Sequence, residues 1–261
     1  PIVAGTCRRI ADRIEFIAAG DGFPLTLGGD HSLSAGSVAG LARHFRRTNR
    51  KLGLLWVDAH ADMNTPQTSP SGNIHGMPVA ALLGHGADEL VAISDPGPAL
   101  QPDQVVLFGI RDVDEGERKK IAELGVRVYS MQEIDARGVG QCLAEAFEKL
   151  LGNNDGLHVS FDMDAVDPAH APGVGTPVPG GFTIREAHLI CEAVAQTEKL
   201  AGFDLVEVNP TLDLRNQTAE LAVWLLQSAL GKLTVPTPIL EEMFTSRGVP
   251  MSRGVTRSAG R

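Results

Sequence analysis

The chain has 261 residues, of which 43% are hydrophobic and 21% charged, and its formal net charge is −9. This length and apolar fraction suffice for one or two domains with a sizeable core and argue against disorder. The negative charge argues against nucleic acid and anionic lipid as partners, and no apolar run approaches the ~20 residues that span a bilayer. Three widely separated cysteines and the lack of a signal-peptide pattern favour a reducing compartment, so we expect a cytoplasmic globular protein.

Short apolar runs, separated by longer mixed segments, are predicted to be strands. In chain order they are residues 23–27, 52–57, 105–110, 126–129, 157–161 and 205–208. The runs are continuous rather than alternating, which is typical of strands covered on both faces. An amphipathic segment occupies residues 1–19, and helical patterns lie between the later strands, for example at residues 140–151, 184–196 and 219–230. The alternation of strands and helices predicts one α/β domain with a parallel sheet.

The two ends of the chain differ from this pattern. A parallel α/β domain usually begins with a strand, so the helical opening segment suggests that the sequence starts partway through the fold. Residues 234–261 contain three Pro, four Arg and little periodicity. We therefore expect a single domain over residues 1–233 and an extended C-terminal arm over 234–261, with an oligomer contact as the alternative for the arm.

Carboxylates and histidines follow four of the apolar runs at the point where each run ends. The segments are Gly28-Gly29-Asp30-His31-Ser32, Asp58-Ala59-His60-Ala61-Asp62, Asp162-Met163-Asp164-Ala165-Val166-Asp167 and Glu207-Val208-Asn209. Ligands of open parallel sheets bind at the carboxyl ends of the strands, so these clusters are predicted to converge. Side chains two residues apart share a face of a strand, so Asp58, His60 and Asp62 project together if the strand persists that far, and Asp162 and Asp164 do likewise.

The charge of these clusters points to metal ions. The four central carboxylates are Asp58, Asp62, Asp162 and Asp164. Packed side by side they would repel one another severely unless cations lay among them, and their charge balances two dications. The His31 and His60 imidazoles add nitrogen ligands. Because this set is rich in carboxylates and lacks thiolates, it favours Mn²⁺ over Zn²⁺, Fe²⁺ or Co²⁺.

Each residue alone has a more ordinary interpretation. A single Asp at a strand end usually caps a helix or turn, and a lone His is more often a hydrogen-bonded core or surface residue than a ligand. Asp30 and Asp167 are interpreted equally well as caps or as partners of the ligands. The histidines outside the clusters keep the ordinary interpretation: His44, His85, His158, His170 and His188. Repetition of the pattern after several apolar runs makes the metal interpretation the stronger one.

These motifs together resemble those of the ureohydrolase family, and segments 71–78 (Ser-Gly-Asn-Ile-His-Gly-Met-Pro), 173–177 (Gly-Val-Gly-Thr-Pro) and 206–210 (Val-Glu-Val-Asn-Pro) are similar to arginases in particular. The likeness runs in order from about Phe23 to Leu230. It implies the arginase–deacetylase fold, a three-layer αβα domain with a central, mostly parallel sheet. It also implies a binuclear Mn²⁺ cluster and a homo-oligomer, either a trimer or a hexamer. The family normally has a further N-terminal strand, which the domain here is predicted to lack.

Carried over position by position, the resemblance implies a role for each candidate residue. One Mn²⁺ would be held by His31, Asp58, Asp62 and Asp162, and the other by Asp58, His60, Asp162 and Asp164. Positions that bind the α-carboxylate and α-amino groups of the substrate are matched by Asn64, Ser71 and Asp114. Positions that face the guanidinium group are matched by Thr176 and Glu207. The implied catalytic residues are Glu207, which orients the guanidinium, Asp164, a proton relay, and His75, the proton shuttle.

The reaction implied is hydrolysis of L-arginine to L-ornithine and urea. Within the same class, the alternatives are an agmatinase or a guanidinobutyrase-type ureohydrolase. A non-catalytic metal-binding or assembly protein with the same fold is the alternative from another class. A metal-dependent deacetylase is a weaker alternative, because residues 71–75 are of the arginase type.

Overall fold

The computed structural model describes residues 1–197, 199–232, 245 and 247. Within these residues, six strands form one sheet in the order β1-β6-β5-β2-β3-β4, and neighbouring strands are parallel. In chain order the strands are β1 (Leu25–Leu27), β2 (Leu52–Val57), β3 (Val105–Ile110), β4 (Arg127–Ser130), β5 (Gly156–Asp162) and β6 (Leu200–Val206). The carboxyl ends of all six strands therefore meet at one edge, as predicted for a ligand-binding edge.

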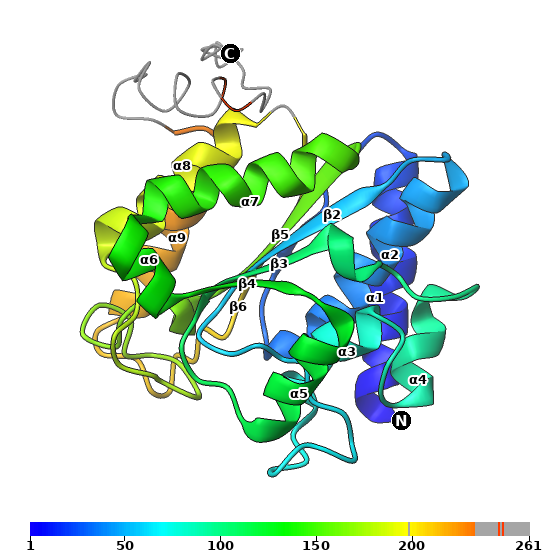
Figure 1. Ribbon diagram of the computed structural model, residues 1–261, viewed down its shortest axis with the longest axis horizontal. Helices are drawn as coiled ribbons and strands as arrows, with labels where there is room; N and C mark the ends of the chain where they lie inside the picture. Colours follow the sequence, from blue (N-terminus) through cyan, green and yellow to red (C-terminus); the bar gives the residue numbers. More distant parts are fainter. Residues whose placement is uncertain (198, 233–244, 246, 248–261) are drawn as a thin grey trace.

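Helices cover both faces of the sheet (Figure 1). One face carries α1 (Ile2–Ala19), α2 (Ser34–Arg47), α3 (Pro78–Leu82), α4 (Asp88–Val91) and α5 (Glu115–Leu124). The other face carries α6 (Met131–Arg137), α7 (Val139–Asn153), α8 (Ile184–Gln196) and α9 (Gln217–Ala229). Each layer of helices encloses its own buried hydrophobic core against the sheet. The three-layer αβα fold is confirmed.

The predicted strands are present, although their ends differ from the prediction. The largest shift concerns the run at 205–208, because β6 begins at Leu200 and ends at Val206. Asp204 interrupts the apolar pattern of this strand, yet its side chain is fully buried. The hydroxyl groups of Ser34 and Ser37 donate hydrogen bonds to this carboxylate. A carboxylate can lie inside a buried strand when another element supplies its hydrogen-bond donors. The local sequence of the strand does not reveal these donors.

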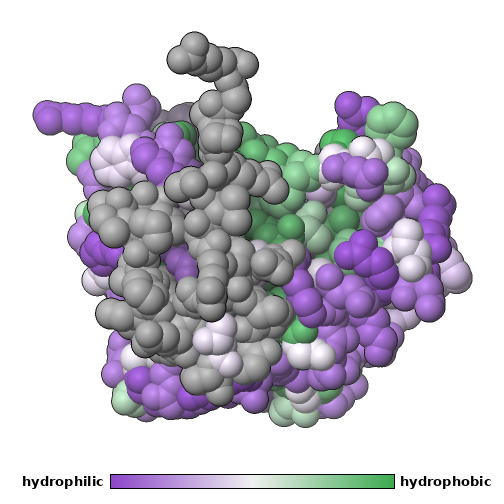
Figure 2. Space-filling model, turned by 90° about the horizontal axis from the view of Figure 1, so that it is seen from above, coloured by the Kyte–Doolittle hydropathy of each residue, from purple (hydrophilic) through white to green (hydrophobic). Residues whose placement is uncertain are grey.

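One edge of the sheet is formed by β1, whose Leu27 side chain is 62% exposed. Exposed large hydrophobic side chains also occur on α1 and α9, and Figure 2 shows hydrophobic residues gathered in a hollow on one face of the molecule. The predicted lack of the family's N-terminal strand stays a prediction, as does the single-domain boundary at 233. The predicted arm at 234–261 lies outside the described residues except for Thr245 and Arg247. No helix of the described part is both long and apolar enough to cross a membrane.

Helix α2 starts just after His31, so its packing helps to position the site. Its two glycines, Gly36 and Gly40, lie one helical turn apart and face α1. A Cβ atom on Gly36 would lie 2.3 Å from the carbonyl oxygen of Cys7, and one on Gly40 would lie 2.3 Å from that of Ala11. Side chains larger than hydrogen at these positions would force the two helices apart.

We expect Gly40→Ala to lower the free energy of unfolding by about 1–3 kcal/mol, the usual cost of overpacking a well-packed contact. Gly5→Ala is the matched control, because Gly5 lies in α1 and a Cβ atom there has room, with its nearest neighbour 3.9 Å away. The control should be neutral or slightly stabilising, since alanine is the better helix former. Urea unfolding of both variants measures the difference, and equal stabilities would contradict the proposed close contact.

Candidate active site

The predicted site residues line one cavity of about 250 Å³ at the carboxyl edge of the sheet. The lining includes His31, Asp58, His60, Asp62, Asn64, Ser71, His75, Asp114, Asp162, Asp164, Thr176 and Glu207. These residues come from the segments that follow β1, β2, β3, β5 and β6. The structure therefore brings together residues from positions 31 to 207, as the strand-end pattern predicted.

The local geometry at β2 differs from the prediction. The strand stops at Val57, so alternation along a strand does not align Asp58, His60 and Asp62. Instead, a turn follows in which the Asp58 carboxylate accepts a hydrogen bond of 2.7 Å from the backbone N–H of His60. Asp62 adopts a left-handed backbone conformation with φ of 52°, which is uncommon outside glycine. This turn directs all three side chains toward the same space.

A similar turn follows β5. Asp162 is the last residue of the strand, and Asp164 lies in the short 3₁₀ helix Met163–Ala165. The Asp162 carboxylate accepts a hydrogen bond of 2.6 Å from the backbone N–H of Asp164 and so caps this helix. The expectation that the two side chains share a strand face is wrong, because the strand ends between them. The capping bond, rather than strand alternation, brings the two carboxylates together.

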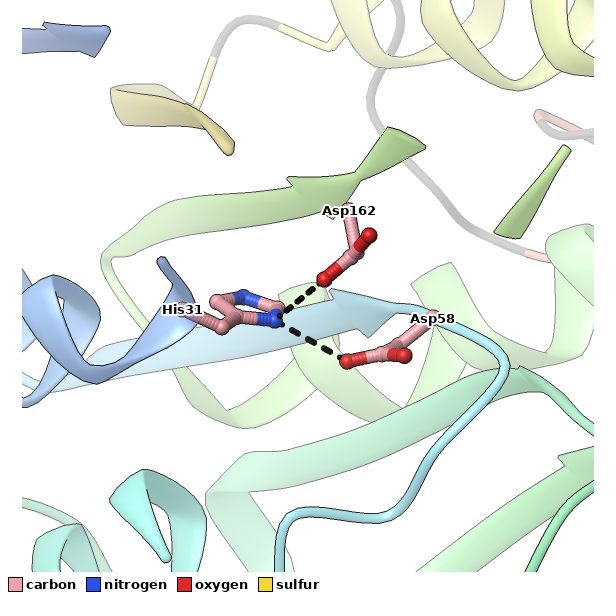
Figure 3. A group of neighbouring side chains, drawn as sticks. All are labelled: His31, Asp58 and Asp162. Carbon is pink, nitrogen blue, oxygen red and sulfur yellow. Dashed lines mark ion pairs between the residues drawn. The ribbon is translucent and has the colours of Figure 1, made fainter. Parts of the chain in front are cut away.

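The first candidate metal-ligand group comprises His31, Asp58 and Asp162 (Figure 3). The Nδ1 atom of His31 lies 3.0 Å from a carboxylate oxygen of Asp58 and 3.0 Å from one of Asp162. The nearest oxygen of Asp62 lies 3.5 Å away. The His31 ring stacks on Trp56 at 3.9 Å between centroids. Its buried Nδ1 atom has no hydrogen-bond partner in the described structure, so its lone pair is available to a cation.

The second group comprises Asp58, His60 and Asp164. The Nδ1 atom of His60 lies 3.0 Å from a carboxylate oxygen of Asp164 and 3.4 Å from Oδ1 of Asp58. Asp58 thus belongs to both groups and contributes a different oxygen to each, Oδ2 to the first and Oδ1 to the second. Bridging by Asp162 stays a prediction.

The electrostatics of the site favour bound cations. Burial and repulsion from Asp58 raise the pKa of Asp62 well above its usual range. Burial and repulsion from Asp164 and Asp58 do the same to the pKa of Asp162. Burial alone would lower the pKa of His60, but the Asp164 and Asp58 carboxylates outweigh it and raise this pKa to about 12. The clustered carboxylates therefore repel one another, and these oxygen-rich, thiolate-free side chains fit hard divalent ions.

The Glu207 carboxylate lines the same cavity. Glu207 directly follows β6 and has a left-handed backbone with φ of 66°. Its backbone N–H donates to the carbonyl of Gly29, and its Oε1 accepts a hydrogen bond of 2.8 Å from the backbone N–H of His31. His75 faces it, with 3.9 Å between His75 Nδ1 and Glu207 Oε1. An acceptor for a cationic group is thereby fixed beside the candidate ligands.

The rim of the cavity is formed by polar loop residues. Asn64 Nδ2 donates a hydrogen bond of 2.7 Å to Oδ2 of Asp114. The other oxygen of Asp114 accepts from the N–H of Glu117 and caps α5. The Ser71 hydroxyl is exposed and accepts a hydrogen bond of 3.2 Å from the N–H of Asn73. Capping therefore occupies part of the hydrogen-bonding capacity of Asp114 and Ser71, while both residues still line the cavity.

Comparisons with known proteins identify the family of this chain. The family model described as the arginase family matches residues 2–231. The chain belongs to the arginase family. The arginase of Bacillus caldovelox is 47% identical over 230 residues, which are 88% of this chain and 76% of that protein. The crystal structure of Bacillus subtilis arginase aligns with a TM-score of 0.85 at 45% identity, covering 89% of this chain and 81% of that one.

A third similar structure carries a ligand. Entamoeba histolytica arginase, solved in complex with L-ornithine, aligns with a TM-score of 0.83 at 33% identity and covers 88% of this chain and 76% of that one. The enzyme class follows from these relatives: this arginase-family chain is a hydrolase. Its candidate ligand groups agree with a metalloenzyme.

Three polar or charged side chains that line the cavity escaped the sequence analysis: Ser69, Asp112 and Glu117. Asp112 and Asp114 follow β3 in the same Asp-x-Asp pattern that follows β5, so the strand-end signal was available for Asp112. The Glu117 carboxylate accepts hydrogen bonds of 3.2 Å from the N–H groups of Met63 and Asp114. It thereby ties the loop after β2 to the loop after β3, a long-range contact that local sequence does not show.

The interpretations left open for Asp30 and Asp167 are resolved toward capping. Asp30 accepts a hydrogen bond from the N–H of Ser32 at the start of a 3₁₀ turn. Asp167 accepts hydrogen bonds from the N–H groups of Ala169, Gly180 and Gly181. Both carboxylates therefore shape the loops that carry site residues.

Proposed function

We propose that this protein hydrolyses L-arginine to L-ornithine and urea with two Mn²⁺ ions per chain. The observation that carries the proposal is the placement of Glu207 in the same cavity as two candidate ligand groups that share Asp58. A carboxylate matches the planar guanidinium with parallel hydrogen bonds. The ornithine bound to the E. histolytica relative is the product expected here.

The bound ions would supply Lewis acidity and a water of lowered pKa as nucleophile at mild pH. Glu207 would hold the guanidinium with its carbon facing the ligand groups. The hydrogen bond from His31 to Glu207 Oε1 fixes the carboxylate orientation, so little rotational freedom is lost when the substrate binds. Thr176 lies at the same end, where its hydroxyl donates to Oδ2 of Asp164 at 3.3 Å.

Proton transfer is assigned to Asp164 and His75. Departure of ornithine requires a proton on the leaving amine, and Asp164 would relay it within the cavity. The His75 side chain is 32% exposed and also lines the cavity, so it reaches both solvent and the reacting groups. We propose that it exchanges protons between them.

Recognition of an α-amino acid is assigned to the rim. Asn64 and Ser71 would donate to the α-carboxylate, and Asp114 would accept from the α-ammonium. Agmatine lacks the α-carboxylate, so an agmatinase has no need of these donors. A cytoplasmic location and assembly into a trimer or hexamer stay predictions.

Metal stoichiometry tests the shared ligand. Mn²⁺-loaded protein should approach two ions per chain, and Asp58→Ala should lose both because each group contains Asp58. His31→Ala should lose mainly one ion. Elemental analysis after dialysis measures the ratio, with exposed Asp103→Ala as a control that retains both ions. One ion in the parent protein, together with a harmless Asp58→Ala, would contradict the shared site.

The role of His75 predicts a different phenotype. His75→Asn should retain the metal ions but reduce kcat by ~10²–10⁴-fold, the usual contribution of general acid–base catalysis. Added imidazole should restore part of the rate. The control is His170→Asn, which lies outside this cavity and should be active. Normal turnover by His75→Asn, or a loss that imidazole leaves unchanged, would argue that His75 only shapes its loop.

Substrate choice tests the rim. Arginine should exceed agmatine in kcat/KM by about 10²-fold or more, because a site with donors for a carboxylate leaves them unpaired with agmatine. Asp114→Asn preserves a capping side chain for α5 but removes the charge, so it should raise KM for arginine and retain the metal content. The rate of urea release measures both the kcat/KM ratio of the two substrates and the KM of the variant for arginine. Comparable turnover of the two substrates would move the assignment to another ureohydrolase.

A further inference from the structure

A line of buried polar side chains extends from His31 away from the cavity. The Nε2 atom of His31 lies 2.7 Å from the hydroxyl of Ser160, which lies 3.1 Å from the hydroxyl of Ser34. The Ser34 hydroxyl donates a hydrogen bond of 2.9 Å to Oδ2 of Asp204. All of these side chains are buried, and only His31 among them lines the cavity. The line connects a candidate metal ligand to the carboxylate inside β6.

The chemistry of the groups gives this line one direction. A carboxylate only accepts hydrogen bonds, so Ser34 must donate its proton to Asp204. Ser34 then accepts from the Ser160 hydroxyl, and Ser160 accepts from the Nε2–H of His31. With its proton on Nε2, a neutral His31 presents the Nδ1 lone pair, the atom that faces Asp58 and Asp162 (Figure 3). The tautomer required for ligation by Nδ1 is the one that the line selects.

Further contacts hold Asp204 as a carboxylate. Its Oδ2 also accepts a hydrogen bond from Ser37 and lies 3.0 Å from Nε2 of His158 on the adjacent strand β5. Burial alone would raise the pKa of Asp204, but His158 and the hydroxyl donors outweigh it, so this pKa lies below its usual value. An ionised acceptor is thus fixed at the far end of the line.

We propose that Asp204, acting through Ser34 and Ser160, is a positioning residue that fixes the Nε2-protonated tautomer of His31 and so strengthens divalent metal binding at Nδ1. The proposal rests on the metal-binding part of the proposed function. Residues that orient a ligating histidine typically change metal affinity by about 10–100-fold when they are removed. Asp204 lies beyond two intervening hydroxyls, so an effect near the lower bound is expected.

Helix α2 offers a matched pair of variants. Ser34 and Ser37 are both fully buried, both lie on α2, and both donate to Oδ2 of Asp204. Only Ser34 also contacts Ser160. Ser34→Ala and Ser37→Ala therefore remove the same atom and one bond to the same acceptor, but only Ser34→Ala interrupts the line to His31.

The side chain of Trp56 gives a local readout. Its ring stacks on His31, and its Nε1–H donates a hydrogen bond of 2.9 Å to Asp58. The sequence contains one other tryptophan, Trp224, whose side chain is 52% exposed. In a Trp224→Phe background, the fluorescence of Trp56 reports on Mn²⁺ binding at the His31 group through the stacked ring, and on both groups through Asp58. Metal content after equilibrium dialysis at limiting Mn²⁺ gives an independent measure.

In this background, Ser34→Ala should weaken Mn²⁺ binding at the His31 group by about 10-fold. Ser37→Ala should leave that affinity close to the parent value. Both variants should lower the Tm of the metal-free protein, and Ser34→Ala should lower it further, because it loses the hydrogen bond from Ser160 as well as the one to Asp204. Asp204→Asn should weaken Mn²⁺ binding as well. If this variant fails to fold, the comparison of Ser34→Ala with Ser37→Ala still tests the proposal.

The outcomes separate the two proposals. Equal Mn²⁺ affinities of Ser34→Ala and Ser37→Ala would overturn the positioning role while leaving the metal site in place. Lack of Mn²⁺ binding by the parent protein would overturn the proposed function and this proposal together. A loss of Mn²⁺ affinity in Ser34→Ala but not in Ser37→Ala, with both variants folded at the temperature of the assay, supports the line from Asp204 to His31.

Discussion

Mutual repulsion among buried carboxylates is the constraint on which the rest of this structure depends. Asp58, Asp62, Asp162 and Asp164 are all buried around two imidazoles. Such a group is stable only where cations compensate the charge and a rigid frame prevents the carboxylates from separating. The parallel sheet supplies this frame, because β2 and β5 are adjacent and end at the same edge. The positions of the candidate metal ligands therefore follow from the topology of the sheet.

Unusual backbone geometry occurs in the loops that follow β2 and β6 and carry carboxylates of the cavity. Asp62 and Glu207 both have left-handed conformations, which are uncommon for residues with side chains. The surroundings hold both in place: the carbonyl of Asp62 accepts hydrogen bonds from the N–H groups of Val79 and Ala80, and the N–H of Glu207 donates to Gly29. Such conformations persist where neighbouring structure determines them and concentrate at functional sites. They direct a carboxylate into the cavity from loops that no strand alternation would align.

Much of the fold and the site was accessible from sequence, because both follow from local patterns. Apolar runs marked the strands, and carboxylates at their ends marked the residues that line the cavity. The details that were missed depend on contacts between distant residues. The apolar run at 52–57 marked the end of β2 correctly, but local sequence does not show the turn that brings Asp58, His60 and Asp62 together. Nor does it show that Ser34 and Ser37 donate hydrogen bonds to an Asp inside β6. The sequence analysis interpreted His158 only as a core or surface histidine without a role in the metal clusters. In the structure it is buried, and its Nε2 atom lies 3.0 Å from the carboxylate of Asp204, 46 positions away in the sequence.

The cavity divides into a floor and a rim that differ in rigidity. Residues of the floor, such as Asp58 and Asp162, are buried at strand ends and bonded to backbone or core side chains. Residues of the rim, such as Ser71 and His75, lie on a loop after β2 and reach solvent. Substitutions in a buried, hydrogen-bonded group disturb its neighbours, whereas exposed loops tolerate change. If the rim binds the substrate as proposed, substrate preference can therefore change at the rim while the candidate metal-ligand groups of the floor are retained.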